Sequence, residues 1–232
     1  MSRSDDVREG LARVRGRIES AAAVAGRDAG EITLVVVTKF FPASDVRLLA
    51  DLGIIHVGEN RHQEAVDKAA DCADLPLMWH FLGGLQSNKA AAVAGYADVV
   101  ESVDRAKLVR GLQHGAHERG RDLDVLLQVS LDPPDAAGRS GAERGSLDGL
   151  AAAVDDAGAL RLRGLMAVAP LEEDPEAAFG RLAEIRREFL GAHPDATVLS
   201  AGMSGDLEAA VRAGATHVRV GSAILGPRPE AK

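Results

Sequence analysis

The chain has 232 residues, 46% of them hydrophobic, and a formal net charge of −8. An acidic chain without a long basic run is a poor match for nucleic acid or an anionic membrane, and no apolar run approaches the roughly 20 residues that span a bilayer. The single cysteine, Cys72, permits no internal disulfide, and the polar segment Met1–Gly10 is no signal peptide. We therefore expect a cytoplasmic protein that binds neither nucleic acid nor membrane. We also expect a monomer, although composition does not bear on that expectation.

Helical and strand-like patterns alternate along the whole chain. Apolar residues at helical spacing predict an opening helix over residues 4–25. Eight short apolar runs then predict strands buried on both faces: residues 32–38, 55–57, 78–82, 98–101, 123–129, 162–167, 197–199 and 217–220. Helical segments separate these strands, so the pattern favours an α/β fold of the (β/α)8 TIM-barrel type with an extra N-terminal helix. An open doubly wound sheet is the alternative, because periodicity does not report closure.

No Pro- or Ser-rich linker divides the chain. We therefore expect residues 1–232 to form a single barrel domain, with the helix in residues 1–28 packed on the barrel. The longest predicted loop, 132–145, contains Gly138 and Arg139 and is interpreted as a lid or a plain linker. A dinucleotide-binding fold is disfavoured, because the first strand ends in Thr-Lys-Phe-Phe-Pro and not in a Gly-rich turn.

Lys39 ends the first predicted strand, in the segment LVVVTKFFP from Leu34 to Pro42. The carboxyl ends of barrel strands are where ligands bind. Partial desolvation at a strand end lowers the pKa of a lysine, and the free amine can form a Schiff base with an aldehyde. Alternatively, Lys39 is an ordinary strand-end lysine whose charge reaches water.

The loops after the seventh and eighth strands have the composition of a phosphate site. Gly202 and Gly221 permit close backbone approach, and Ser204 and Ser222 add hydroxyl donors. In barrel enzymes these two loops commonly bind phosphate. The alternative is that Ser204 or Asp206 caps the following helix and the glycines make tight turns.

Three further polar residues lie near strand ends. Arg219 is predicted on the face opposite Val218 and Val220, where it either meets a ligand or pairs with a carboxylate such as Glu59. Asn60 has the position of a helix cap. His80 is interpreted as a hydrogen-bonded core histidine and not as a base. The histidines show no spacing with Cys72 or acids that predicts a metal site.

Taken together, these segments resemble the pyridoxal phosphate homeostasis protein family, small relatives of the alanine racemase barrel. The matching motifs are VTK ending at Lys39, GENRHQEA from Gly58, WHFLGGLQSNK from Trp79, GLMAVAP from Gly164, SAGMSGD from Ser200 and THVRVGSAILGPR from Thr216. The resemblance implies pyridoxal 5'-phosphate (PLP) as cofactor, held as an aldimine on Lys39. It also implies that Ser204, Gly221 and Ser222 hold the phosphate, that Arg219 faces the pyridine nitrogen, and that Asn60 lies beside the ring.

The same resemblance implies a binding protein that keeps PLP in homeostasis, with apo-enzymes that use PLP as partners and no substantial turnover. An arginine at the pyridine nitrogen weakens the ring as an electron sink, and Tyr96, the one tyrosine, lies within the barrel sequence. A PLP-dependent racemase is the main alternative, and a sugar isomerase that uses Lys39 is a third. Phe41 stands where the family often has a second lysine, so a role for a second amine is in doubt.

Overall fold

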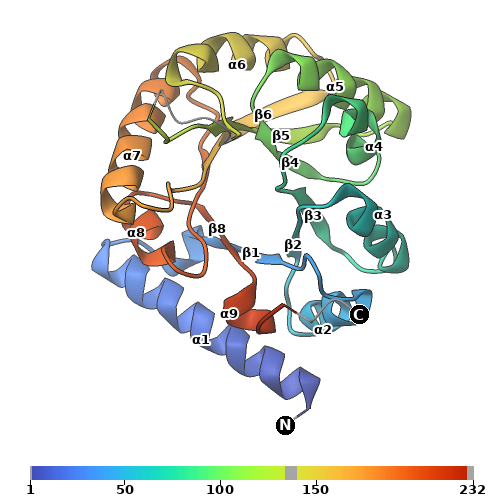
Figure 1. Ribbon diagram of the computed structural model, residues 1–232, viewed down its shortest axis with the longest axis vertical. Coiled ribbons are helices and arrows are strands. Elements are labelled where there is room, and N and C mark those ends of the chain that lie inside the picture. The colour runs from blue at the N-terminus through green and yellow to red at the C-terminus, as the bar shows by residue number, and fades with distance from the viewer. Residues whose placement is uncertain (1, 134–139, 229–232) are drawn as a thin grey trace.

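Eight parallel strands close into a barrel in this computed structural model, which describes residues 2–133 and 140–228 (Figure 1). The strands follow one another around the barrel in chain order, and β8 pairs with β1 through the register Val36 to Val220. Their bounds are β1 Thr33–Val37, β2 His56–Glu59, β3 Met78–Phe81, β4 Val99–Val103, β5 Leu123–Val129, β6 Leu160–Ala167, β7 Val198–Ser200 and β8 His217–Val220. The predicted TIM barrel is confirmed, and closure excludes the open sheet.

Helices surround the barrel as the alternating pattern predicts (Figure 1). They are α2 Ala43–Asp51, α3 His62–Asp71, α4 Ala90–Ala94, α5 Ala106–Arg119, α6 Leu147–Asp155, α7 Pro175–Ala192 and α8 Leu207–Arg212. Short 3-10 turns lie at Ala29–Glu31, Ser87–Lys89 and Arg144–Ser146. The sequence pattern did not predict α9, Ser222–Leu225, because four residues are too few to show a helical period.

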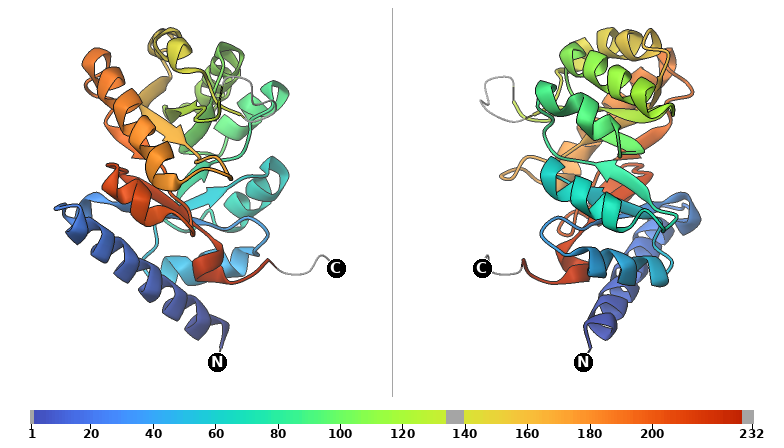
Figure 2. Two further views of the ribbon diagram at one scale, coloured as in Figure 1. Left: turned by 60° about the vertical axis from the view of Figure 1, so that its left-hand side comes forward. Right: turned by 90° about the vertical axis from the view of Figure 1, so that its right-hand side faces the viewer.

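The N-terminal helix α1, Arg3–Val24, crosses the outside of the barrel next to α8 and α9 (Figure 2). Its buried face, which includes Val7, Leu11 and Val14, joins one apolar cluster with residues of β1 and β8. At Gly10 the two helices come so close that a Cβ atom would lie 2.5 Å from the carbonyl oxygen of Ile224. The absence of a side chain at Gly10 therefore lets α1 pack directly on α9, the helix that begins with Ser222.

A second apolar cluster fills the space between the β3–β7 side of the barrel and its helices, with Phe179, Leu112 and Leu165 among its fully buried members. Within residues 2–133 and 140–228, no helix is long and apolar enough to cross a bilayer. Part of the predicted 132–145 loop, including Gly138 and Arg139, lies outside the described residues. Among the described residues of this loop, Ala142 forms an isolated β-bridge with Val129 at the end of β5.

Candidate functional site

A cavity of about 370 Å³ lies at the carboxyl ends of β1 and β8 and the loop that follows β7. Five of the six residues that the family resemblance assigns to the cofactor line it: Lys39, Ser204, Arg219, Gly221 and Ser222. The sixth, Asn60, lines a separate hollow of about 320 Å³ at the ends of β2, β3, β5 and β6. The fold thus brings residues from both ends of the chain to one mouth of the barrel.

Lys39 is partly buried in this cavity. Burial lowers the pKa of its amine, the nearby charges of Arg228 and Arg61 lower it further, and Glu59 opposes them. The direction of the shift agrees with the prediction made for a lysine at a strand end. A neutral amine is therefore more accessible at Lys39 than at an ordinary surface lysine.

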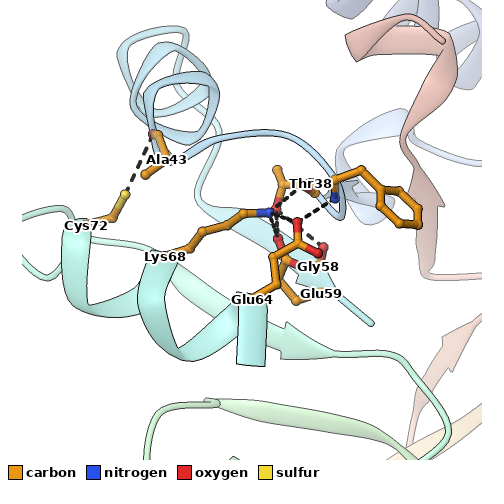
Figure 3. Close-up of polar contacts among 8 residues, drawn as sticks. Thr38, Ala43, Gly58, Glu59, Glu64, Lys68 and Cys72 are labelled. Atoms are coloured by element: carbon orange, nitrogen blue, oxygen red, sulfur yellow. Dashed lines mark hydrogen bonds and ion pairs between the residues drawn. The ribbon is translucent and has the colours of Figure 1, made fainter. Parts of the chain in front are cut away.

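The residues on either side of Lys39 are held by a buried polar cluster. The Lys68 amine donates to the Thr38 carbonyl oxygen, to Glu59 Oε1 and to Glu64 Oε1, each at 2.7 Å (Figure 3). The Thr38 hydroxyl donates to Glu59 Oε1 at 2.6 Å, and the backbone N–H of Phe40 donates to Glu64 Oε1 at 2.5 Å. Because both neighbours of Lys39 are fixed in this way, its side chain is directed into the cavity.

The sequence pattern did not predict this Lys68 cluster. The only local signal was the i,i+4 spacing of Glu64 and Lys68 on α3, which usually indicates an exposed ion pair. Here Lys68 is only 6% exposed, because α3 packs its side chain against the end of β1.

The loops after β7 and β8 bring two hydroxyl groups together. Ser222 Oγ lies 3.4 Å from Ser204 Oγ, so one anion can accept hydrogen bonds from both. Gly202 has φ 90°, a conformation that favours glycine, and a Cβ at Gly221 would lie 2.9 Å from the Val37 carbonyl oxygen. Asp206 has the N-cap position of α8, as the helix-cap alternative expects, but it makes no side-chain cap; its carboxylate accepts instead from the Met203 N–H at 2.5 Å.

Arg219 is buried and reaches the cavity from inside the barrel. Its Nη1 donates to Ser200 Oγ at 2.8 Å and its Nη2 to the Ala167 carbonyl oxygen at 2.9 Å. The nearest carboxylate is Glu101, with Oε2 at 4.0 Å from Nη1. The suggested partner Glu59 is wrong, because that side chain faces Lys68 on α3 and not the barrel interior.

Glu101 is the centre of a hydrogen-bonded chain through the barrel. Its carboxylate contacts His80 Nδ1 at 2.7 Å and accepts from the Ser200 hydroxyl at 2.6 Å, and His80 Nε2 lies 2.9 Å from His56 Nδ1. Burial raises the pKa of Glu101, but the His80 hydrogen bond and nearby charges outweigh it and lower the pKa to about 2. His80 is thus a hydrogen-bonded core histidine, as predicted, and the ionised Glu101 balances the Arg219 guanidinium.

Asn60 does not cap α3. The helix begins at His62, the preceding residue Arg61 makes no side-chain cap, and Asn60 Oδ1 is buried without a hydrogen-bond partner among the described residues. A buried amide oxygen without a partner is uncommon, so this atom is available to a ligand at the barrel mouth.

The chain matches the sequence profile of the alanine racemase N-terminal domain over residues 11–229. It is 42% identical to the pyridoxal phosphate homeostasis protein of Mycobacterium tuberculosis H37Rv, over 97% of this chain and 94% of that protein. It is 40% identical to the protein of the same name from Escherichia coli K12, over 98% of this chain and 99% of that protein. The chain belongs to the pyridoxal phosphate homeostasis protein family.

A solved structure of PipY from Synechococcus elongatus, with PLP bound, is similar throughout its length. The sequences are 36% identical, the TM-score is 0.78, and the similarity covers 90% of this chain and 100% of that one. The alanine racemase of Clostridium difficile, at 13% identity and a TM-score of 0.72, shares the fold. The resemblance read from the sequence motifs is thereby confirmed at the level of the family.

Proposed function

We propose that this protein binds pyridoxal 5'-phosphate and serves in its homeostasis, with Lys39 holding the aldehyde as a Schiff base. The observation that carries the proposal is the position of Lys39. Its amine, with a lowered pKa and no hydrogen bond or ion pair among the described residues, shares one cavity with Ser204, Ser222 and Arg219. Residues 1–232 would act as one cofactor-binding unit.

The aldehyde, the phosphate and the pyridine nitrogen of PLP each have a chemically suitable partner at the barrel mouth. Ser204, Gly221 and Ser222 would hold the phosphate through hydroxyl and backbone donors, and Arg219 would donate to the pyridine nitrogen. Asn60, with its unpaired oxygen, would lie beside the ring from the adjacent hollow. The PLP-bound structure of PipY supports the same choice of cofactor.

We further propose that the bound cofactor undergoes no substantial turnover. PLP supplies an electron sink when its pyridine nitrogen carries a proton, and an arginine that donates to this nitrogen prevents that protonation. A racemase also needs a second acid–base group. Tyr96 does not line the cavity; it stacks on His62 outside the barrel, and burial raises the pKa of its hydroxyl. The names of the relatives, homeostasis proteins, also support a non-catalytic role.

Transfer of PLP to apo-enzymes, the monomeric state and a cytoplasmic location stay predictions from the sequence. The 132–145 loop has no assigned role in the proposal.

The direct test is the absorption spectrum of the purified protein with PLP, before and after borohydride reduction, followed by peptide mapping. We expect a Schiff-base band and a reduced label on Lys39 alone. Lys39→Ala should lose the band and the label, whereas Lys107→Ala, on the exposed surface of α5, should keep both. A label on Lys89 or Lys68 would contradict the assignment, and the absence of any band would favour the sugar isomerase.

A chiral assay tests the absence of turnover. Wild-type protein with added PLP and several amino acids should racemise them no faster than free PLP does. Sustained multiple turnover would establish the racemase alternative.

A further inference from the structure

We propose that Arg61 and Arg228, both stacked over the ring of Phe40, form a second anion site beside Lys39 that binds the α-carboxylate of a free amino acid. The inference rests on the proposed function and adds the class of a second ligand to the same mouth of the barrel. We call Arg61 and Arg228, which both contact the Phe40 ring, the arginine pair.

The arginine pair is defined by its contacts with one aromatic ring. The guanidinium carbon of Arg228 lies 3.6 Å from the centre of the Phe40 ring, and that of Arg61 lies 4.6 Å from it. Arg228 and Phe40 also line the cavity that contains Lys39. Two cationic groups that are far apart in the chain therefore meet at the residue next to Lys39.

The ring that carries the arginine pair is held in an unusual backbone conformation. Phe40 has φ 72°, the one positive φ at a non-glycine residue in residues 2–133 and 140–228. For a residue with a side chain, this left-handed conformation is unfavourable, because Cβ comes too close to the following carbonyl oxygen. The Phe40 N–H is fixed by Glu64, which is itself fixed by Lys68. The surrounding contacts thus hold the ring in place, so that the platform for the two guanidinium groups is preorganised.

The donors of both guanidinium groups are available to a ligand. Among the described residues, neither Arg61 nor Arg228 has a hydrogen bond or an ion pair, whereas other arginines of this acidic chain, such as Arg17 and Arg47, bind carboxylates. Stacking on an aromatic ring uses the face of a guanidinium and leaves its N–H edge free. Such an edge matches the geometry of a carboxylate.

The position next to Lys39 selects the chemical class of the ligand. The cofactor phosphate is assigned to Ser204 and Ser222, so the arginine pair is left for a different anion. A free amino acid bound there by its carboxylate would carry its amino group on the adjacent carbon, close to the position of the Lys39 amine. Its charge would also offset the two positive charges that act on Lys39.

The test compares two ligands that share an amine and differ in the carboxylate. PLP-loaded protein is titrated with alanine and with alaninamide, and the absorption spectrum gives the half-saturating concentration of each. The preference for alanine is the half-saturating concentration of alaninamide divided by that of alanine. This ratio should be at least tenfold lower in the double variant Arg61→Gln/Arg228→Gln than in wild type. Arg110→Gln, an exposed arginine on α5 without a hydrogen bond or ion pair among the described residues, should leave the ratio unchanged.

A second measurement is independent of the cofactor chemistry. N-acetylalanine has the carboxylate but cannot react with an aldehyde, and calorimetry should detect its binding to wild type and at least tenfold weaker binding to the double variant. An unchanged preference ratio, or equal N-acetylalanine binding, overturns the proposal. Weaker binding of PLP with unchanged binding of pyridoxal, which lacks the phosphate, would also overturn it, because the arginine pair would then hold the phosphate.

The two proposals fail in different ways. If wild-type protein takes up no PLP, the proposed function is wrong, and the N-acetylalanine titration of the cofactor-free protein still decides whether the carboxylate site exists. If wild-type protein takes up PLP but the arginine substitutions change nothing, the carboxylate site alone is wrong.

Discussion

Lys39 and Lys68 lie at the same corner of the barrel in opposite surroundings. Lys68 is 6% exposed and donates to three oxygen atoms, two of them carboxylate oxygens. Lys39 is partly buried and has no such partner among the described residues. Burial and the positive charges of Arg228 and Arg61 lower the pKa of its amine. The paired amine holds the structure together, whereas the unpaired amine is available to a carbonyl group.

Arginines show the same contrast. Arg219 is buried, and two of its donors bind Ser200 and a backbone carbonyl next to the ionised Glu101. Arg228, at the rim of the same cavity, has no hydrogen bond or ion pair within the described part of the chain. The charge of Arg219 is thus balanced inside the barrel by Glu101, whereas the charge of Arg228 at the mouth is left for a ligand.

The largest effect should come from breaking the paired side of this contrast. Lys68→Met leaves Glu59, with a side chain only 1% exposed, buried without its cation. Breaking a buried ion pair in this way typically costs about 3–5 kcal/mol of unfolding free energy. Guanidinium unfolding followed by circular dichroism would measure it, with the exposed Lys107→Met as the control that should change little. A loss below about 1 kcal/mol would show that the Lys68 cluster is not what holds the end of β1.

A histidine of β8, His217, predicts a dependence of stability on pH. Burial lowers the pKa of His217 from 6.5 to about 4, although Glu101 opposes the shift. Between these values the unfolded chain binds a proton that the folded protein does not. The free energy of unfolding should therefore fall as the pH drops from 6.5 to 4, by about 3 kcal/mol for this group.

His217→Gln removes this titration, so the difference in stability between pH 7 and pH 4 should shrink by about that amount in urea unfolding. His114→Gln, at an exposed position on α5, should keep the wild-type difference. An identical pH profile for His217→Gln and wild type would refute the assignment.

The smallest expected effect concerns the hydroxyl groups at the mouth. Ser204→Ala/Ser222→Ala should raise the dissociation constant for PLP at least about tenfold, because a charge-assisted hydrogen bond contributes roughly 1.5–3 kcal/mol. Binding of pyridoxal, without the phosphate, should be unchanged. The matched control is Ser20→Ala on α1, which removes a hydroxyl that donates to the Gly16 carbonyl and should leave PLP binding unchanged. Equal PLP affinity in the double variant would mean that backbone donors suffice or that the phosphate binds elsewhere.

Local sequence pattern determined a large part of this fold. The short apolar runs gave all eight strands, because a strand buried on both faces has to be apolar along most of its length. The same pattern located Lys39 at a strand end, Arg219 inside the barrel, and the loops with Ser204 and Ser222. Each of these is a property of one element and its immediate ends.

Only the closed barrel decided which charges are paired and which are left free. Glu101 and Ser200 are 99 residues apart and meet because their strands face each other across the interior, a relation that no local period reports. Likewise Lys68 is buried because α3 packs against the end of β1, and the Phe40 ring brings Arg61 together with Arg228. Burial of the strand residues follows from local pattern, but the burial of Lys68 and the partner that each charged group meets depend on closure and register, which are set by the whole chain.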